Sequence, residues 1–481
     1  MVYAAYGVSG LTGIVGTFFV KDYLDLSPAF LAALAFWAGI PWAMKMPVGH
    51  LVDLIWRWKA VLVWLGAAMI AVSLAIMVGL IRHTAAMREI MSAGNWYVLA
   101  ALLAPTGYMI QDAVADAMTV EAVPRVDEYG KPYDEAARKS MHTTMQTLGR
   151  VALIGGLALV AGVNVWLFHD TANLPKEQKA ALYANVYAAA LIIPVLSVLG
   201  VVLHRFLRHE RETVEKTRPN WAVLGGSLVF VAFTLAVGLG GVPNAEEIIF
   251  AGSLAVILFL LWRLARELEP VARSTLVATA IVLFLYRAVP LTGDGTSWWM
   301  IDVLKFDEGF LSQIALLTYA LTLAGMFALR GFMARHSIST IVVVLSIAAA
   351  ALSAPTIGMF YGLHEWTAAH TGGVLDARAI ALVNTALESP LGQIAMIPML
   401  AWIANSAPPN LKATYFAVMA SFSNLALAAS QLGTVYLNRF FVVKRGDYSE
   451  LGELMIAAAI ITLVLPLAAV AGVRLLRMKV A

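Results

Sequence analysis

The sequence predicts an all-α protein that crosses a membrane many times. Of its 481 residues, 60% are hydrophobic and only 13% are charged, whereas soluble domains are about 25% charged. Apolar runs recur from one end of the chain to the other, and each has about the 20 residues that a helix needs to cross roughly 30 Å of hydrocarbon. A globule of this composition has too few polar side chains to cover its surface, so a polytopic helical membrane protein is the predicted class.

Charged residues, prolines and glycines interrupt the apolar runs and divide them into fourteen predicted transmembrane helices. In chain order these helices span residues 3–20, 29–48, 60–81, 97–120, 141–168, 182–204, 221–240, 247–268, 274–291, 311–331, 338–361, 379–403, 411–434 and 453–473. The third and the fourteenth runs are the least interrupted. The ninth is the weakest, because it contains an arginine, Arg287.

The predicted helices form two groups of six around a basic segment, HRFLRHERETVEKTR at residues 204–218. Six helices precede this segment and six follow residue 274, so the pair at 221–268 is interpreted as an insertion. The predicted parts are an N-terminal six-helix bundle at 1–207, a cytoplasmic linker with two extra helices at 208–273, and a C-terminal six-helix bundle at 274–481.

The placement of lysine and arginine predicts the orientation, because cytoplasmic loops are enriched in both residues. With the N-terminus inside, the inner loops and the C-terminal tail hold about 20 of these residues and the outer loops about 10. One outer segment opposes this bias with Arg439, Lys444 and Arg445. No cleaved signal peptide is expected at the start of the chain. Both termini are therefore predicted in the cytoplasm, and the protein in the inner (plasma) membrane.

Several classes of chemistry are excluded by residue patterns that the sequence lacks. The chain has no cysteine, which excludes disulfides, thiolate metal sites and cysteine nucleophiles. Its nine histidines show no metal-binding spacing, and it has no Walker or Rossmann glycine pattern. We therefore expect no metal, no cofactor, no nucleic-acid partner and no enzymatic activity.

The segment KMPVGHLVDLIWRWK follows the second predicted helix. It places Gly49 first, then Asp53, then the basic pair Arg57 and Lys59. This order resembles the inner loop after the second helix of major facilitator transporters, in which the aspartate accepts hydrogen bonds from helix ends and the basic residues face the cytoplasm. The resemblance implies a major facilitator fold, with two six-helix bundles that rock against each other around a site at the membrane midplane.

Four separated blocks of sequence carry a closer family resemblance. They are FFVKDYLDLSPAFLAALAFWAGIPWAMKMPVGHLVD (18–53), QDAVADAMTVE (111–121), VLFLYRAVPLTGDGTSWWMIDVLKFDEGFLSQI (282–314) and LGQIAMIPMLAWIANSAPPNLKATYFAVMASFSNL (391–425). In this order, and in both halves, they resemble the folate–biopterin transporter family. The resemblance implies a secondary-active transporter of folate, a pteridine or a similar flat organic anion.

Acidic residues lie near the end of the fourth predicted helix. Asp112 and Asp116 are four residues apart, so they share one face of a helix about one turn apart, and Glu121 follows toward the inner side. An ionised carboxylate at the bilayer centre costs roughly 2.5–3.5 kcal/mol on insertion scales unless it is paired, hydrated or protonated. Two interpretations stay open: these carboxylates bind a proton or gate the cavity, or they brace helix ends through ion pairs.

Three cations, Lys45, Arg150 and Arg287, lie inside apolar runs, where each needs a carboxylate, a cavity or an anionic ligand. Arg287 is expected either to touch an anionic group of the substrate, because a guanidinium pairs bidentately with carboxylates, or to pair with Asp294 or another group of the outer loop. Arg150 is expected to pair with a carboxylate of the fourth helix, as a relay if protonation breaks the pair and as structural support if it does not. Lys45 either binds substrate or extends its ammonium to the inner interface.

Two tryptophans and two amides complete the predicted site. Trp298 and Trp299 have flat indole faces on which a pterin ring would stack, although tryptophan is also typical of membrane-interface anchors. Gln393 and Asn424 are amides in helices, which would either hydrogen-bond the edge of a pterin or cross-link helices.

The resulting hypothesis is a proton-coupled transporter that works by alternating access, in which protonation of a fourth-helix carboxylate changes its pairing with Arg150. Its partners would be the small-molecule substrate, protons and the lipid bilayer. Two alternatives remain. One is a peptidoglycan-fragment permease of the same superfamily, whose fourth helix also carries a Gln-Asp…Asp pattern. The other is a non-transporting factor with this fold that hands a pigment or a lipid to a membrane complex.

Overall fold

The computed structural model is helical throughout the part of the chain that it describes. That part comprises residues 1–480 except 25, 44, 122, 124–126, 128, 172–173, 208–228, 230, 239, 267, 393, 400–401 and 403–411. Within these residues the chain forms helices and turns and no β-strand. The all-α class is confirmed.

Eleven helices of the described residues are long and apolar enough to cross a membrane. They are Val2–Tyr23, Trp56–Arg82, Ala93–Thr119, Thr147–Leu167, Lys176–Leu203, Ala245–Arg263, Pro270–Arg287, Glu308–Ala328, Ile338–Phe360, Ala377–Met399 and Leu451–Leu475. A shorter apolar helix covers Pro28–Trp42. Half of the residues of the predicted helix at 221–240, namely 221–228, 230 and 239, lie outside the described part of the chain. The total of fourteen helices therefore stays a prediction.

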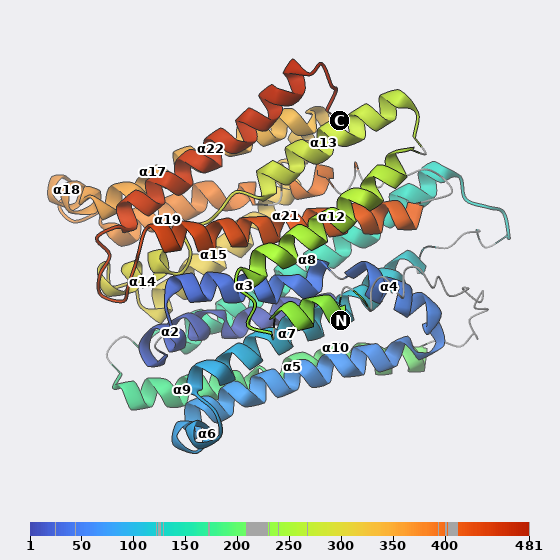
Figure 1. Ribbon diagram of the computed structural model, residues 1–481. Helices are drawn as coiled ribbons and strands as arrows, with labels where there is room; N and C mark the ends of the chain where they lie inside the picture. Colours follow the sequence, from blue (N-terminus) through green and yellow to red (C-terminus); the bar gives the residue numbers. More distant parts are fainter. Residues whose placement is uncertain are drawn as a thin grey trace. The chain divides into compact units, whose positions relative to one another are not determined.

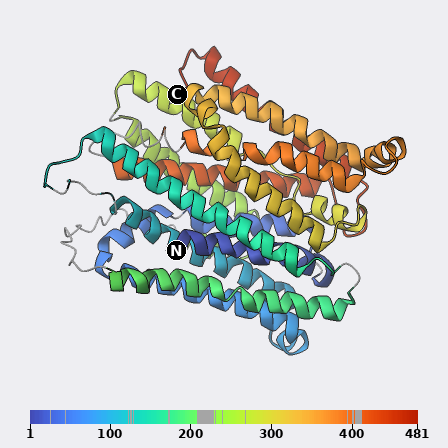
Figure 2. The ribbon, with the colours of Figure 1, turned by 180° about the vertical axis from the view of Figure 1, so that it is seen from behind.

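The chain separates into two compact units. Unit 1 comprises Met1–Leu24 and Met44–Leu235, and unit 2 comprises Asp25–Ala43 and Ala236–Ala481. The named elements of unit 1 are α1 (Val2–Val8), η1 (Ser9–Thr12), α2 (Gly13–Tyr23), α4 (Lys45–Leu54), η2 (Trp56–Trp58), α5 (Lys59–Arg82), α6 (Thr84–Ile90), α7 (Ala93–Glu121), α8 (Glu135–Leu167), α9 (Lys176–Ala189) and α10 (Ile192–Leu207) (Figure 1). Figure 2 shows the long helix α8 from the opposite side.

Unit 2 contains the helices of the later half together with α3. Its named elements are α3 (Pro28–Ala43), α12 (Ala245–Arg266), α13 (Pro270–Arg287), α14 (Gly295–Asp302), α15 (Glu308–Ala328), α16 (Arg330–Arg335), α17 (Ile338–Phe360), α18 (Leu363–His370), α19 (Ala377–Glu388), η3 (Ser389–Leu391), α21 (Lys412–Phe440) and α22 (Leu451–Leu475). The division into two six-helix bundles and an inserted pair stays a prediction.

Glycines allow the first helix of unit 1 to approach α8 closely. A Cβ atom on Gly7 would collide with the Leu153 carbonyl oxygen and lie 2.9 Å from the Cα of Gly156. One on Gly10 would lie 2.7 Å from a methyl carbon of Leu157. Small residues with this spacing let helix backbones come together in a membrane, where van der Waals packing holds helices to one another. The α1–α8 contact therefore depends on residues without side chains.

The helix that carries the paired aspartates, α7, is held against its neighbours by a second close approach and a buried amide. A Cβ on Gly66 of α5 would lie 2.6 Å from the Gly107 carbonyl oxygen of α7. Gln111, buried on α7, donates from its Nε2 to the Val63 carbonyl oxygen and to the Ser197 hydroxyl, each at 2.9 Å. These bonds join α7 to α5 and α10, so the position of α7 within unit 1 is fixed from two sides.

Polar contacts tie α12, one helix of the predicted insertion, to α3 and α21 within unit 2. The indole Nε1 of Trp37 donates to Glu246 Oε1 at 3.1 Å. The Tyr436 hydroxyl donates to Glu247 Oε1, and the Arg439 guanidinium lies 4.0 Å from the same oxygen. The two glutamates at the start of α12 therefore attach it to two different helices.

Replacing Gly7 by alanine is expected to destabilise the protein by about 1–3 kcal/mol, the usual cost of overpacking. The reason is that the added Cβ meets backbone atoms of α8, which cannot rotate away. Thermal unfolding of the purified protein in detergent measures the effect. Gly13→Ala is the matched control, because a Cβ there meets no atom within 4 Å. Equal unfolding temperatures for the two variants would contradict the close α1–α8 contact.

Candidate functional site

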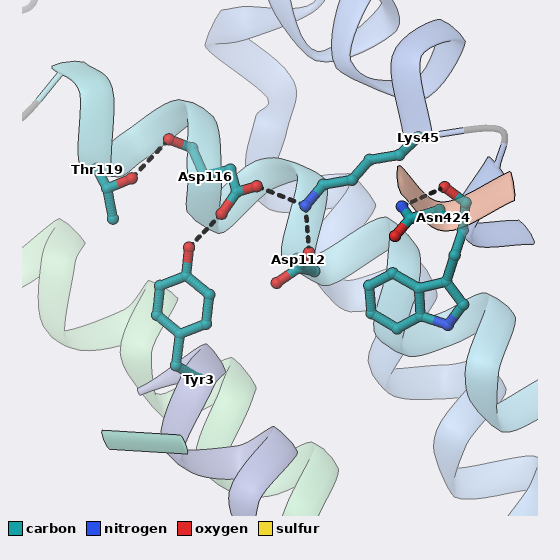
Figure 3. A network of polar contacts seen from close by, with 7 residues as sticks. Tyr3, Lys45, Asp112, Asp116, Thr119 and Asn424 are labelled. Atoms are coloured by element: carbon teal, nitrogen blue, oxygen red, sulfur yellow. Dashed lines mark hydrogen bonds and ion pairs between the residues drawn. The ribbon is translucent and has the colours of Figure 1, made fainter. Parts of the chain in front are cut away.

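The clearest cluster of charge in unit 1 joins a lysine to two aspartates. Lys45 is the first residue of α4, and its ammonium Nζ lies 2.5 Å from Asp112 Oδ2 and 2.5 Å from Asp116 Oδ2 (Figure 3). The two aspartates are one turn apart on α7, so both carboxylates face the same ammonium. The predicted sharing of one helix face is confirmed.

A tyrosine from the first helix completes the cluster. The Tyr3 hydroxyl donates to Asp116 Oδ1, which leaves Asp116 bonded through both of its carboxylate oxygens (Figure 3). The Thr119 hydroxyl donates to the backbone oxygen of Asp116 at 2.7 Å. Sequence reasoning missed Tyr3, because the sequence offers only a tyrosine near the start of a glycine-rich helix.

The cluster is partly open to its surroundings. The side chains of Asp112, Lys45 and Asp116 are 16%, 23% and 32% exposed. When all three are ionised, two negative charges face one positive charge, so the group carries a net charge of −1. Asp116 is the more exposed of the two carboxylates.

Lys45, and not Arg150, is the ion-pair partner of the two aspartates. Among the described side chains Arg150 lies close enough to act on Asp112 through space, yet it forms no ion pair with either carboxylate. The expected pairing with Arg150 is therefore corrected. The physical reason is reach: the flexible four-carbon side chain of lysine places one compact ammonium between two carboxylates.

The structure describes the side chains of only some of the other predicted site residues in the N-terminal half. Glu121 is the last residue of α7 and Asp53 lies in α4, but neither side chain is among the described parts. Gly49 also lies in α4, and Arg57 is exposed on η2. The Lys59 ammonium lies over the Trp56 ring, 3.8 Å from its centroid.

Arg287 lies at the end of α13 in unit 2 and contacts α21. Its Nε donates to the Ser423 carbonyl oxygen at 3.3 Å, and its Nη1 lies 3.4 Å from the Met396 sulfur. Among the described side chains no ion pair joins Arg287 to Asp294. The expected pairing with Asp294 is therefore corrected, and the pairing with another outer-loop group stays a prediction. Arg287 also lines a small cavity together with Phe284 and Met419.

The predicted amides and tryptophan fall in different places. Asn424 follows Ser423 on α21, and its Nδ2 donates to the Trp42 carbonyl oxygen at 3.0 Å, so it cross-links α21 to α3 (Figure 3). Trp298 is 1% exposed, and the Arg445 guanidinium lies 5.8 Å from the centroid of its ring. A ring this deeply buried has no open face for a ligand in this arrangement. Gln393 lies outside the described residues.

Sequence comparison connects the chain to one family of proteins. The model of the BT1 family matches residues 6–474. A curated relative from Synechocystis sp., named folate-biopterin transporter, is 24% identical over 472 residues, which cover 97% of this chain and 79% of that protein.

Solved structures with a similar fold include transporters of the major facilitator type. A POT family transporter in complex with 5-aminolevulinic acid has a TM-score of 0.67 at 11% identity, over 98% of this chain and 95% of that one. A peptide transporter POT in complex with alafosfalin has a TM-score of 0.63 at 15% identity, over 99% and 94%. The xylose transporter XylE from E. coli, inward open, has a TM-score of 0.55 at 11% identity, over 97% and 92%. At these identities the likeness concerns the fold.

Replacing Lys45 by methionine is expected to destabilise the protein by roughly 2–4 kcal/mol, because it leaves two partly buried carboxylates without their ion-pair partner. Thermal unfolding in detergent measures the loss. Lys59→Met is the control, since Lys59 contacts an aromatic ring at the edge of α5. Adding Asp112→Asn to Lys45→Met should recover part of the stability. A Lys45→Met variant no less stable than Lys59→Met would contradict the ion-pair cluster.

Proposed function

The chain belongs to the BT1 family, and from this premise we propose that it is a proton-coupled transporter of folate, a pteridine or a similar flat organic anion. The family and the fold make the chain a multi-pass membrane transporter and not an enzyme. The observation that carries the proposal further is the cluster of Lys45, Asp112 and Asp116. It holds an unbalanced charge inside a membrane-spanning bundle.

The charge balance of the cluster suits proton coupling. The ionised group carries a net charge of −1, and the nearby guanidinium of Arg150 brings the local sum close to zero. Uptake of one proton by Asp116 leaves Lys45 with a single ionised partner and makes the neighbourhood net positive by one charge. A net positive neighbourhood favours entry of an anion. Binding of a proton would therefore raise the affinity for the anion, and binding of the anion would raise the affinity for the proton.

Protonation also loosens the contacts that join three helices. Lys45 begins α4, Tyr3 lies in α1, and both bond to Asp116 of α7. A neutral carboxylic acid keeps a much weaker attraction for the ammonium than a carboxylate does. In the proposed cycle, protonation of Asp116 weakens its bond to Lys45. The equilibrium between the inward-open and outward-open states then shifts. Substrate and proton leave together on the other side of the membrane.

The substrate class rests on the relative's name and on the cation in unit 2. The Synechocystis protein is named a folate-biopterin transporter, and folates carry carboxylates on a flat pterin-containing body. Arg287 lines the small cavity of unit 2 with aromatic and methionine side chains. A guanidinium next to such surfaces suits a flat anion, because it pairs with carboxylates bidentately and stacks on rings. Arg287 is proposed as the partner of the substrate's carboxylate.

The proposal also includes the orientation of the protein in the membrane and the membrane in which it lies. The excess of lysine and arginine in the predicted inner loops supports both termini in the cytoplasm, with the protein in the inner (plasma) membrane. Of the functions considered from the sequence, the family match favours pteridine transport over a peptidoglycan-fragment permease and over a non-transporting assembly factor.

In liposomes, uptake of labelled folate and of a simple pterin is expected to rise with an inward proton gradient and to lose that response in Asp116→Asn. The amide cannot exchange a proton, so gradient-driven uptake should fall at least about tenfold. Exchange of labelled for unlabelled substrate, which needs no net proton movement, should continue. Asp170→Asn is the control, because Asp170 is a largely exposed carboxylate beside His169. Unchanged gradient-driven uptake in Asp116→Asn would make that carboxylate structural.

Replacing Arg287 by glutamine is expected to weaken folate uptake more than pterin uptake. A carboxylate partner is present in folate and absent from a simple pterin, so KM for folate should rise about tenfold while KM for the pterin changes little. Arg287→Lys should rescue folate uptake only in part, since lysine does not form the bidentate pair. An equal rise of KM for both compounds would assign Arg287 to helix packing against Ser423 instead.

A further inference from the structure

A second cavity lies in unit 1, away from the charged cluster. It has a volume of about 480 Å³ when the open space at its mouth is included. Most of its lining is apolar or aromatic, from Phe19 and Tyr23 of α2, Leu80 and Ile81 of α5, and Ala180 of α9. One charged residue lines it, Arg88 of α6.

The position of α6 places this cavity at the edge of the bilayer. The helix spans Thr84–Ile90 and lies between two membrane-spanning segments, Trp56–Arg82 and Ala93–Thr119. In Figure 1 it turns away from the end of α5. A link this short between two spans can only lie at the membrane boundary. The exposed side chain of Ile90 on the same helix adds apolar surface at that level.

Contacts with the neighbouring helices fix the orientation of α6. The indole Nε1 of Trp96 donates to the Met87 carbonyl oxygen at 2.9 Å. The Met87 sulfur packs on Gly79 of α5, where a Cβ would lie 2.8 Å from it. Because Met87 is held between α5 and α7, the next residue, Arg88, is held at the rim of the cavity.

The polar side chains that line this cavity are those of Tyr23, Thr84 and Arg88. Among the described residues, Arg88 has no hydrogen-bond or ion-pair partner. The Tyr23 hydroxyl already donates to the Lys176 carbonyl oxygen at 2.8 Å, and the Thr84 hydroxyl donates to the Leu80 carbonyl oxygen at 2.6 Å. The nearby Arg82 differs, because its guanidinium donates to Asn185 Oδ1 at 2.6 Å. An arginine with open donors beside an apolar cavity fits a ligand that has an anionic head and an apolar body.

We propose that this cavity is a binding site for an anionic phospholipid of the surrounding bilayer. The Arg88 guanidinium would pair with the headgroup phosphate, and the part of an acyl chain nearest the headgroup would fill the space between Phe19, Ile81 and Ala180. A bilayer lipid is favoured over a soluble anion because the cavity opens at the membrane boundary and most of its lining is apolar. A bound lipid would hold α2, α5, α6 and α9 together at that end of the unit. The proposal is independent of which substrate the protein transports.

The test is thermal unfolding of the purified full-length protein in detergent, with phosphatidylglycerol or phosphatidylcholine added to the micelles. Phosphatidylglycerol should raise the unfolding temperature by about 3 °C more than phosphatidylcholine does, as expected for a ligand of the native state. Arg88→Gln should remove the difference, and its affinity for the anionic lipid by native mass spectrometry should fall about tenfold, the usual effect of one lost charge-assisted hydrogen bond. Ala180→Trp should also remove it, because the indole occupies the space of the acyl chain.

Arg82→Gln is the matched control and should keep the full response, since Arg82 is bonded to Asn185 and lies outside the lining. Equal shifts with the two lipids would overturn the proposal, as would an unchanged response in Arg88→Gln. Glycerol phosphate tests for a plain anion site: the same shift with this chainless compound would overturn the lipid assignment. If Ala180→Trp fails to fold, the Arg88→Gln and Arg82→Gln pair still decides the outcome.

Discussion

An ionised side chain in hydrocarbon needs a partner, and this constraint organises the N-terminal unit. Asp112 and Asp116 lie inside a membrane-spanning helix, where each carboxylate would be costly alone. Lys45 satisfies both of them, and Tyr3 bonds to the second. Because these partners come from α4 and α1, satisfying two carboxylates also determines which helices meet at α7. The same contacts that stabilise the unit are therefore the ones that a proton would change.

The remainder of the unit keeps α7 in place while its carboxylates stay partly accessible. Gly66 and Gly107 let α5 and α7 meet backbone to backbone, and Gln111 bonds to α5 and α10 from a fully buried position. The glycines and the amide differ in role from the aspartates that follow. The glycines allow close backbone contact and Gln111 bonds to two buried acceptors, whereas the aspartates carry more negative charge than Lys45 neutralises. Gln111, which fixes α7 against its neighbours, and Asp112, which belongs to the charged cluster, are therefore adjacent in the sequence.

In the C-terminal unit, helix α21 is the common partner of elements that are distant in sequence. Consecutive residues of α21 bond to α13 and α3, through the Ser423 carbonyl oxygen and the Asn424 amide. Further along, Tyr436 and Arg439 contact Glu247 of α12. The helix α12 looks like an addition in the sequence, yet it is attached to both α3 and α21. A free, peripheral helix would not place two glutamates at its start against two separate neighbours.

The sequence by itself determined the class of protein, the positions of most apolar helices, the family and the face of α7 that carries charge. These follow from composition, from runs about as long as a bilayer is thick, and from the helical repeat, all of which are local properties. It also indicated that the cations in apolar runs need partners. It did not determine which cation pairs with which carboxylate, because Lys45 and Asp112 are far apart in the chain and Arg150 was an equally charged choice. Only the tertiary structure decided that Lys45 joins both aspartates and that Tyr3 completes the group. The same holds for the burial of Trp298 and for the open donors of Arg88, since both depend on which helices pack together in space.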